Sequence, residues 1–146
     1  MLHNYKKPVF IFILLVGLHG CALKLVDDFN VATYEATLNT SKFVDRFYGG
    51  LLETETNKRP YRQYSAQYVE IETEIRSLYM RNKARPLNEE STRIIDNILG
   101  LWLKYKARHK LRNTYSDGNA KLERKRFSKM FISALNAEEA KKEIKQ

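Results

Sequence analysis

Between residues 61 and 82, one set of side chains recurs at alternating steps of three and four residues. Its members are Tyr61, Tyr64, Tyr68, Ile71, Ile75, Leu78 and Asn82. This spacing places them on a single face of an α-helix, while glutamates and arginines occupy the other faces. The helix is expected to end before Pro86, because the residue that precedes a proline is pushed out of helical geometry. The pattern therefore predicts an amphipathic helix that buries one stripe of side chains.

Three other segments show helical spacing of their apolar residues. The first holds Leu25, Phe29, Ala32, Ala36, Phe43, Phe47 and Leu51; the second holds Ile94, Ile95, Ile98, Leu99, Leu101, Trp102 and Tyr105; the third holds Phe127, Met130, Phe131, Ala134 and Leu135. Asn88 is expected to cap the second of these helices. Gly100 lies inside that helix at a cost of about 1 kcal/mol relative to alanine, so we expect a close helix contact there. Asn136 and Glu139 are spaced like a capping pair and predict the start of a short polar helix.

These patterns predict the fold class. Strand-like alternation is missing, and the 146 residues include only six Gly and three Pro, which favours helices. Four amphipathic segments with short connections predict an all-α fold, an antiparallel bundle of four helices. A chain of this length has room for one domain. We expect a signal segment at 1–20, the helical bundle at 21–136 and a polar helical tail at 137–146.

The N-terminal segment has the pattern of an export signal. A pair of lysines precedes an apolar run at residues 9–18, which is too short for a membrane-spanning helix of about 20 residues. The run leads into Leu18-His19-Gly20-Cys21, and Cys21 is the one cysteine of the chain. This tetrapeptide resembles the lipobox of bacterial lipoproteins, whose usual form is Leu, a small residue, Gly or Ala, and then Cys. His19 departs from that form at its second position.

The resemblance implies a lipid anchor in the bacterial cell envelope. Cys21 would be diacylated on its thiol and would become the first residue after removal of the signal peptide. Two or three acyl chains hold a protein stably on a membrane, whereas a single chain gives only marginal binding. Ala22 stands where an aspartate commonly signals inner-membrane retention, which implies the outer membrane, facing the periplasm, in a Gram-negative cell. The alternative is an uncleaved signal anchor over residues 9–26, which would place His19 in the lipid and Lys24 at its edge.

Positive charge is concentrated between residues 104 and 129. This stretch holds ten basic residues against Asp117 and Glu123, a net charge of +8 where the whole chain carries +9. The ten are Lys104, Lys106, Arg108, Lys110, Arg112, Lys121, Arg124, Lys125, Arg126 and Lys129. In the predicted bundle they gather at one end, where each Lys or Arg close to an anionic membrane is worth about 1 kcal/mol. The stretch suits anionic lipid, an anionic polymer or an acidic envelope protein, with no nucleic acid expected for an exported chain; the alternative is a solvated face that only keeps the protein soluble.

No pattern of catalytic or metal-binding residues is visible. Di-iron bundles carry Glu-x-x-His on facing helices, and the sequence has no such motif. Nucleophile and phosphate-loop motifs are absent as well. His109, between Arg108 and Lys110, is expected to be a solvated member of the basic stretch rather than a ligand. We therefore expect a non-enzymatic protein without a metal or cofactor.

The tyrosines of the first-described helix allow two interpretations. Tyr61, Tyr64 and Tyr68 share their stripe with aliphatic residues, so core packing explains them, and a ligand-binding groove is the alternative. Two functions remain at this point. The first is a binding or scaffold lipoprotein of the cell envelope; the alternative is a carrier of a small apolar or lipidic ligand held between helices near the Tyr and Trp residues. No pattern indicates an oligomeric state.

One further resemblance covers about a quarter of the chain, residues 68–103. Its centre, Arg85-Pro86-Leu87-Asn88, joins two amphipathic helices. It is similar to small helical lipoproteins of the bacterial envelope that carry a comparable Pro-x-Asn junction. The resemblance implies the fold and the location, and it implies no activity.

Overall fold

The computed structural model describes residues 25–145, and within that range the chain forms helices and no β-strand. The long helices are α2 (Val31–Glu53), α3 (Tyr61–Lys83), α4 (Glu89–Arg112) and α5 (Asp117–Glu139). Two short 3-10 helices, η1 (Thr56–Lys58) and η2 (Ala140–Lys145), follow α2 and α5. The expected all-α bundle of four helices is confirmed.

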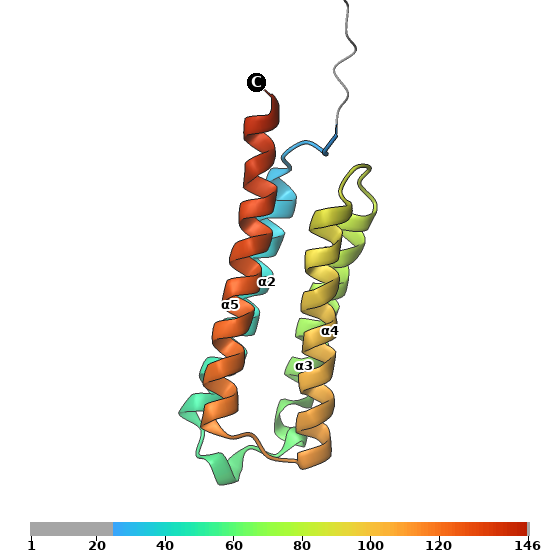
Figure 1. The fold of residues 1–146 in the computed structure, drawn as a ribbon. Helices are drawn as coiled ribbons and strands as arrows, with labels where there is room; N and C mark the ends of the chain where they lie inside the picture. The colour runs from blue at the N-terminus through green and yellow to red at the C-terminus, as the bar shows by residue number, and fades with distance from the viewer. Residues whose placement is uncertain (1–24, 146) are drawn as a thin grey trace, which may run out of the picture.

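Successive long helices run antiparallel, and α5 returns beside α2 to close the bundle (Figure 1). α2 packs most extensively along α5, and α3 along α4, while the α2–α3 and α4–α5 contacts join these two pairs. The start of α2, the α3–α4 turn and the end of α5 lie at one end, which we call the N-terminal end (Figure 1, top). The connections α2–α3 and α4–α5 lie at the other end, the distal end. A helix of 23 residues separates the two ends by about 34 Å.

The predicted stripe of α3 is the buried face of that helix. Six of its seven members are buried, and Tyr61 is half-buried against the core. They meet the apolar stripe of α4, where the Trp102 side chain has no exposed surface. The three-and-four spacing therefore predicted both the helix and its buried face.

In α2, the predicted stripe is wrong over the first half of the helix. The buried residues there are Thr33, Thr37 and Thr40, whereas Ala32 is exposed. Two of these threonines are tolerated inside because their hydroxyls bond to the helix itself: Thr37 Oγ1 donates to the Thr33 carbonyl and Thr40 Oγ1 to the Ala36 carbonyl, each at 2.8 Å. The helix also begins later than expected, after Asn30, whose side chain accepts a hydrogen bond from the Thr33 amide.

Three local expectations differ from the structure. Gly100 is exposed, and a Cβ atom added there would meet nothing within 4 Å, so no close helix contact explains it. Asn88 occupies the N-cap position of α4, but its side chain makes no capping bond and donates instead to the Asn82 carbonyl at 2.9 Å. Asn136 starts no new helix: α5 runs through the expected boundary at 136/137, and the Glu138 side chain beyond it is buried.

Candidate functional site

The expected lipidation site, Cys21, lies outside the described residues. Four positions later, Leu25 is the first described residue, and the chain enters the bundle at the N-terminal end (Figure 1). None of the helices in the described part of the chain is both long and apolar enough to cross a membrane.

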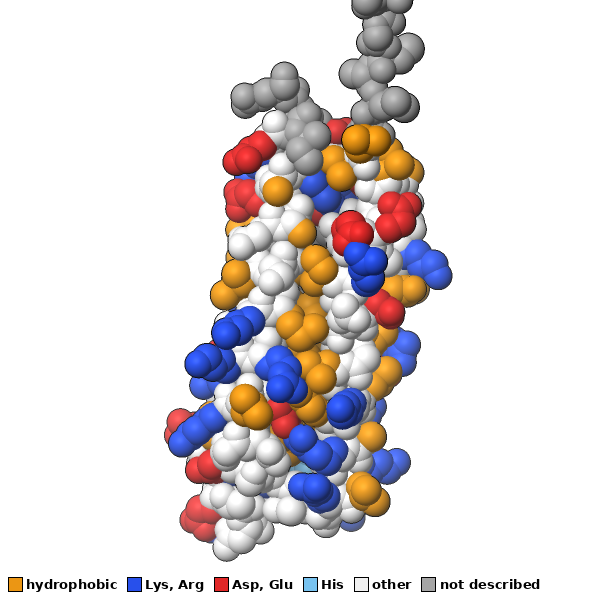
Figure 2. Space-filling view, in the orientation of Figure 1, with side chains coloured by type: hydrophobic (Ala, Val, Ile, Leu, Met, Phe, Trp, Pro, Cys, Tyr) orange, Lys and Arg blue, Asp and Glu red, His pale blue; other side chains and the backbone are white. Residues whose placement is uncertain are grey.

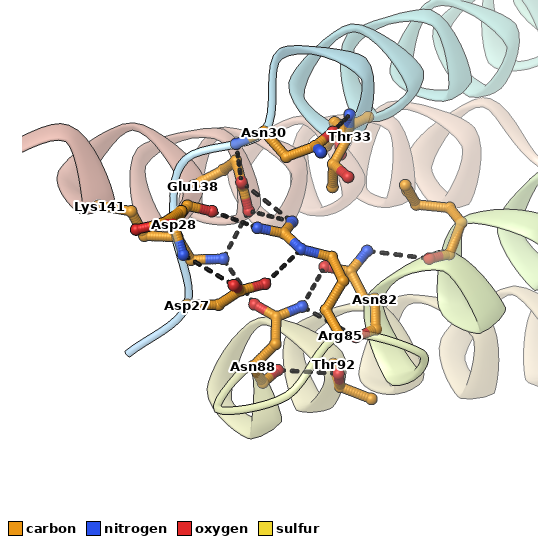
Figure 3. Close-up of polar contacts among 12 residues, drawn as sticks. Asp27, Asp28, Asn30, Thr33, Asn82, Arg85, Asn88, Thr92, Glu138 and Lys141 are labelled. Atoms are coloured by element: carbon orange, nitrogen blue, oxygen red, sulfur yellow. Dashed lines mark hydrogen bonds and ion pairs between the residues drawn. The ribbon is translucent and has the colours of Figure 1, made fainter. Parts of the chain in front are cut away.

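At the N-terminal end, the entering chain is held by a cluster of charged side chains that we call the N-terminal clamp (Figure 3). The clamp consists of Asp27, Arg85, Asn88, Glu138 and Lys141. Arg85, in the α3–α4 turn, pairs with Asp27 at 2.5 Å and with Glu138 at 3.0 Å. Lys141, from η2, pairs with Glu138 at 2.6 Å and donates to Asn88 Oδ1 at 2.5 Å. Three segments far apart in the sequence, at residues 27, 85–88 and 138–141, therefore meet in one polar network.

The clamp also fixes the backbone that leads into α2. The Asp27 amide donates to the Leu87 carbonyl at 3.1 Å, and the Asn30 amide donates to Glu138 Oε1 at 2.8 Å. Arg85 donates in addition to the Asp28 carbonyl. Because buried charges lose their hydration, they are tolerated only when paired and hydrogen-bonded in this way. The network thus sets the direction in which residues 27–30 enter the bundle.

The ten basic residues of the stretch at 104–129 lie in the distal half of the bundle. Those of α4 are in its last turns, and those of α5 extend from its first turns to Lys129 at its middle. On the face formed by α4 and α5, Lys and Arg side chains gather below the middle of the molecule (Figure 2). The predicted concentration of charge at one end is what the structure has, and that end is opposite to Leu25.

Three of the ten basic side chains are engaged by carboxylates. Lys106 pairs with Glu72 at 2.8 Å, Arg108 pairs with Glu123, and Arg124 pairs with Asp45 through two bonds of 2.6 and 2.7 Å. Hydrogen bonding from Arg124 holds the pKa of Asp45 below its ordinary value. Burial opposes ionisation of Glu72, but bonds from Lys106 and Arg76 outweigh it and lower its pKa. These pairs fasten helices to one another. Arg126 donates to the Tyr105 hydroxyl.

The other six basic residues are exposed and form no ion pair within residues 25–145. We call this set the distal basic surface: Lys104, Lys110, Arg112, Lys121, Lys125 and Lys129. Unpaired, hydrated ammonium and guanidinium groups in this number attract anions at long range and gain most from a partner that supplies negative charge. These six, rather than all ten, are free to bind.

Behind the basic surface lies a buried carboxylate that the sequence did not single out. Glu123 is 1% exposed and accepts hydrogen bonds from the hydroxyls of Tyr48 (3.3 Å) and Tyr115, besides its pair with Arg108. Burial alone would lower the pKa of Arg108, but the bond and charge of Glu123 outweigh it and raise the pKa. Burial also raises the pKa of Tyr48 and Tyr115, so both stay neutral donors. The carboxylate of Glu123 is closed to solvent, and the cluster joins α2, α4 and α5.

His109 is buried, and the expectation that it is a solvated member of the basic stretch is wrong. Its side chain is 1% exposed on the core face of α4. Nε2 lies 2.9 Å from the Arg59 carbonyl, which can only accept, so Nε2 carries the proton. Nδ1 then accepts from the Tyr68 hydroxyl at 3.1 Å. Burial lowers the pKa of His109, which favours this neutral form. The sequence did contain a signal for this burial, because His109 lies seven residues after Trp102 and four after Tyr105, on the same helical face.

The region near the Tyr and Trp residues is filled by their own rings. Trp102 lies 5.1 Å from Tyr68 and 5.2 Å from Phe47, measured between ring centroids. Tyr68 and Trp102 are fully buried. A ligand could lie between Tyr68 and Trp102 only by displacing those side chains, although Phe47 and Tyr64 also line a hollow of about 450 Å³ between α2 and α3.

No protein-family model, no curated protein and no solved structure matches this chain. Within the described residues, no group of three or more His, Cys, Asp or Glu side chains could hold a metal ion. The candidate site is therefore defined by the bundle itself: a clamped N-terminal end and a basic distal end.

Proposed function

We propose that this protein is a lipid-anchored, non-enzymatic binding or scaffold protein of the bacterial envelope, whose distal basic surface binds an anionic partner away from the anchoring membrane. The observation that carries the proposal is the opposition of the two ends. Leu25 enters at the N-terminal end, and the unpaired basic residues lie in the distal half. An acyl anchor on Cys21 would be four residues from Leu25, within about 14 Å of extended chain.

Electrostatic range supports a partner beyond that membrane. Charges in solution are screened over about 8 Å at physiological salt, and the bundle is about 34 Å long. When the bundle stands on its N-terminal end, the distal basic surface is therefore out of reach of the headgroups beside the anchor. The N-terminal clamp supports this posture, because it holds residues 27–30 on the end of the bundle from which an anchor on Cys21 would extend. An anionic polymer or an acidic envelope protein is the partner that fits.

The anchor and the binding surface are tested separately. For the anchor, Cys21→Ser should abolish incorporation of radiolabelled palmitate and leave the slower-migrating precursor; unchanged labelling and mobility would refute it. For the surface, Lys125→Glu combined with Lys129→Glu should weaken binding of fluorescent polyglutamate about tenfold or more, since each reversal removes one attraction and adds one repulsion.

The matched control for the surface is Arg81→Glu combined with Lys83→Glu. This pair changes the net charge equally on exposed residues near the N-terminal end. The proposal requires the control to bind polyglutamate like the unaltered protein. Equal losses in both double variants would mean that only net charge matters, and the distal surface would then be no binding site. Arg108 is left unaltered, because a carboxylate there would face buried Glu123.

A further inference from the structure

A groove runs along the seam between α2 and α5, beside the distal basic surface. Its volume is about 610 Å³, and all of its lining residues come from these two helices. The apolar part of the lining consists of Leu38, Val44, Phe127, Phe131, Ile132 and Leu135. Of these, Ile132 is 53% exposed, so its side chain is accessible to an occupant of the groove.

The groove is apolar towards the N-terminal end and charged towards the distal end. Because α2 and α5 are antiparallel, the bidentate pair of Asp45 with Arg124 lies in the distal part of the groove, while Leu38 and Leu135 lie nearest its N-terminal end. From Arg124 to Leu135 the lining covers three helical turns, about 16 Å at 1.5 Å per residue.

The charged part of the groove has an excess of cations. Lys42, Arg46 and Arg124 line it against a single carboxylate, Asp45, which Arg124 already neutralises. A smaller hollow that shares Asp45 and Arg124 continues past Lys121 and Lys125 of the distal basic surface. An occupant of the groove would therefore meet apolar side chains on one part of its length and positive charge on the other.

We propose that this groove binds an acidic amphipathic helix of a partner protein. Two packed helices with an open trench between them accept a third helix that buries its apolar stripe and keeps its other side in water. The cationic end calls for carboxylates on the adjoining turns of that helix. The inference rests on the proposed function, because it names the kind of partner that the basic distal end would bind.

The shape and charge of the groove argue against two other occupants. A small amphiphile is normally buried over 70–90% of its surface, and a trench formed by two helices leaves one side open to water. A second copy seated on the groove would bring another excess of cations, Lys42, Arg46 and Arg124 against Asp45, to the same interface, and like charges across an interface oppose association.

The probe for this inference is a fluorescent 18-residue peptide helix with leucines along one stripe and glutamates flanking it. Its affinity for the protein is measured by fluorescence anisotropy. Ile132→Asp should weaken binding about tenfold or more, because the change places a carboxylate in the middle of an apolar contact. Lys42→Glu should weaken it less. Leu122→Asp is the matched control: Leu122 is 55% exposed on the same helix but does not line the groove, and its substitution should leave the affinity within about twofold.

The other outcomes contradict the inference. Equal binding of a peptide with lysine in place of glutamate, or no binding up to about 1 mM, would overturn it. Competition by dodecyl phosphate that depends on Ile132 would assign the groove to an amphiphile, and an Ile132-dependent dimer in sedimentation would assign it to a second copy. If peptide binding depended on Lys125 and Lys129 but not on Ile132, the groove as binding site would be refuted and the proposed function would stand. If the unaltered protein bound neither the peptide nor polyglutamate, both proposals would be refuted.

Discussion

The two halves of the bundle interior are built from different side chains. Near the N-terminal end, α2 and α4 bury hydroxyl groups: Thr33, Thr37, Thr40 and Ser91. Near the distal end the same helices bury rings, and Trp102 contacts Phe47, Tyr48, Tyr68 and Phe127 at centroid distances of 5.1–6.4 Å. The N-terminal half is closed by the charged clamp, while the distal half holds most of the large apolar area.

This difference between the two halves suggests that they have different roles, one in the stability of the fold and the other in its geometry. Burial of aromatic rings removes 150–250 Å² each from water and is the largest favourable contribution per side chain. Ion pairs in an interior gain little net free energy, yet they admit few alternative arrangements. We infer that the distal half supplies most of the folding free energy and forms a rigid base for the basic surface, whereas the N-terminal half sets how the chain enters the bundle.

The largest effect that tests this comparison is expected at Trp102. Trp102→Ala should lower the free energy of unfolding by about 4 kcal/mol, through lost burial and the cavity that remains. The counterpart in the N-terminal half, Thr37→Ala, removes one hydroxyl and one methyl group and should cost about 1 kcal/mol. Urea unfolding followed by far-ultraviolet circular dichroism measures both. Losses of similar size would show that the two halves contribute equally.

The distal half also shows how far the sequence could predict the fold. The apolar spacing of α3 and α4 identified the helices and their buried faces, because large aliphatic and aromatic side chains have one favourable location. Threonine has no such preference, and the buried Thr33 and Thr37 of α2 were therefore missed. Hydrophobic periodicity predicts the buried face of a helix where that face is hydrophobic. It does not predict a buried face made of hydroxyl-bearing residues, whose side chains can bond to carbonyls of their own helix.

The candidate site divides in the same way. The basic stretch and its gathering at one end followed from local sequence, since neighbouring helix ends are close in space. The sequence could not show that only six of the ten lack a side-chain partner, because the partners Glu72 and Asp45 lie far from residues 104–129 in the chain. The clamp was missed for the same reason: Asp27, Arg85 and Glu138 are brought together only by the closed bundle.

The second effect concerns the N-terminal half alone. Arg85→Met keeps the length of the side chain but leaves Asp27 without its ion pair and Glu138 with Lys141 only, which should cost about 3 kcal/mol. Amide hydrogen exchange of residues 27–30 should accelerate more than that of the distal core. Arg93→Met, which breaks an exposed pair with Glu90, should stay within about 0.5 kcal/mol of the unaltered protein. Exchange that rose uniformly along the chain would show that the clamp does not act locally.

The third effect is a dependence of folding stability on pH that comes from His109 in the distal half. Burial lowers the pKa of His109, so the unfolded chain takes up its proton at a higher pH than the folded chain. Stability should therefore fall as the pH decreases below the ordinary histidine pKa of about 6.5, by at most about 1.4 kcal/mol per pH unit. His109→Gln should remove this part of the dependence between about pH 7.5 and pH 5.5. Urea unfolding of both proteins across that window decides the question, and identical slopes would exclude His109 as its source.

The smallest effect is a gain in stability, and it compares one hydroxyl from each half. Thr33 Oγ1 and Tyr64 Oη are buried without a hydrogen-bond partner. Replacing an unsatisfied buried hydroxyl removes a desolvation cost of about 1 kcal/mol. Thr33→Val keeps the shape and the branching of the side chain, and the Thr33 amide retains its bond to Asn30. Tyr64→Phe likewise keeps the ring beside Phe47, 5.9 Å away between centroids.

Both variants should unfold at higher urea, by up to about 1 kcal/mol each, and their effects should add because the two sites lie in different halves. Thr37→Val provides the contrast, since the Thr37 hydroxyl is bonded to the Thr33 carbonyl and its removal gains nothing. A loss of stability in Thr33→Val would mean that its hydroxyl is bonded in solution. In that case the Thr33 hydroxyl would no longer count as an unsatisfied polar group in the N-terminal half.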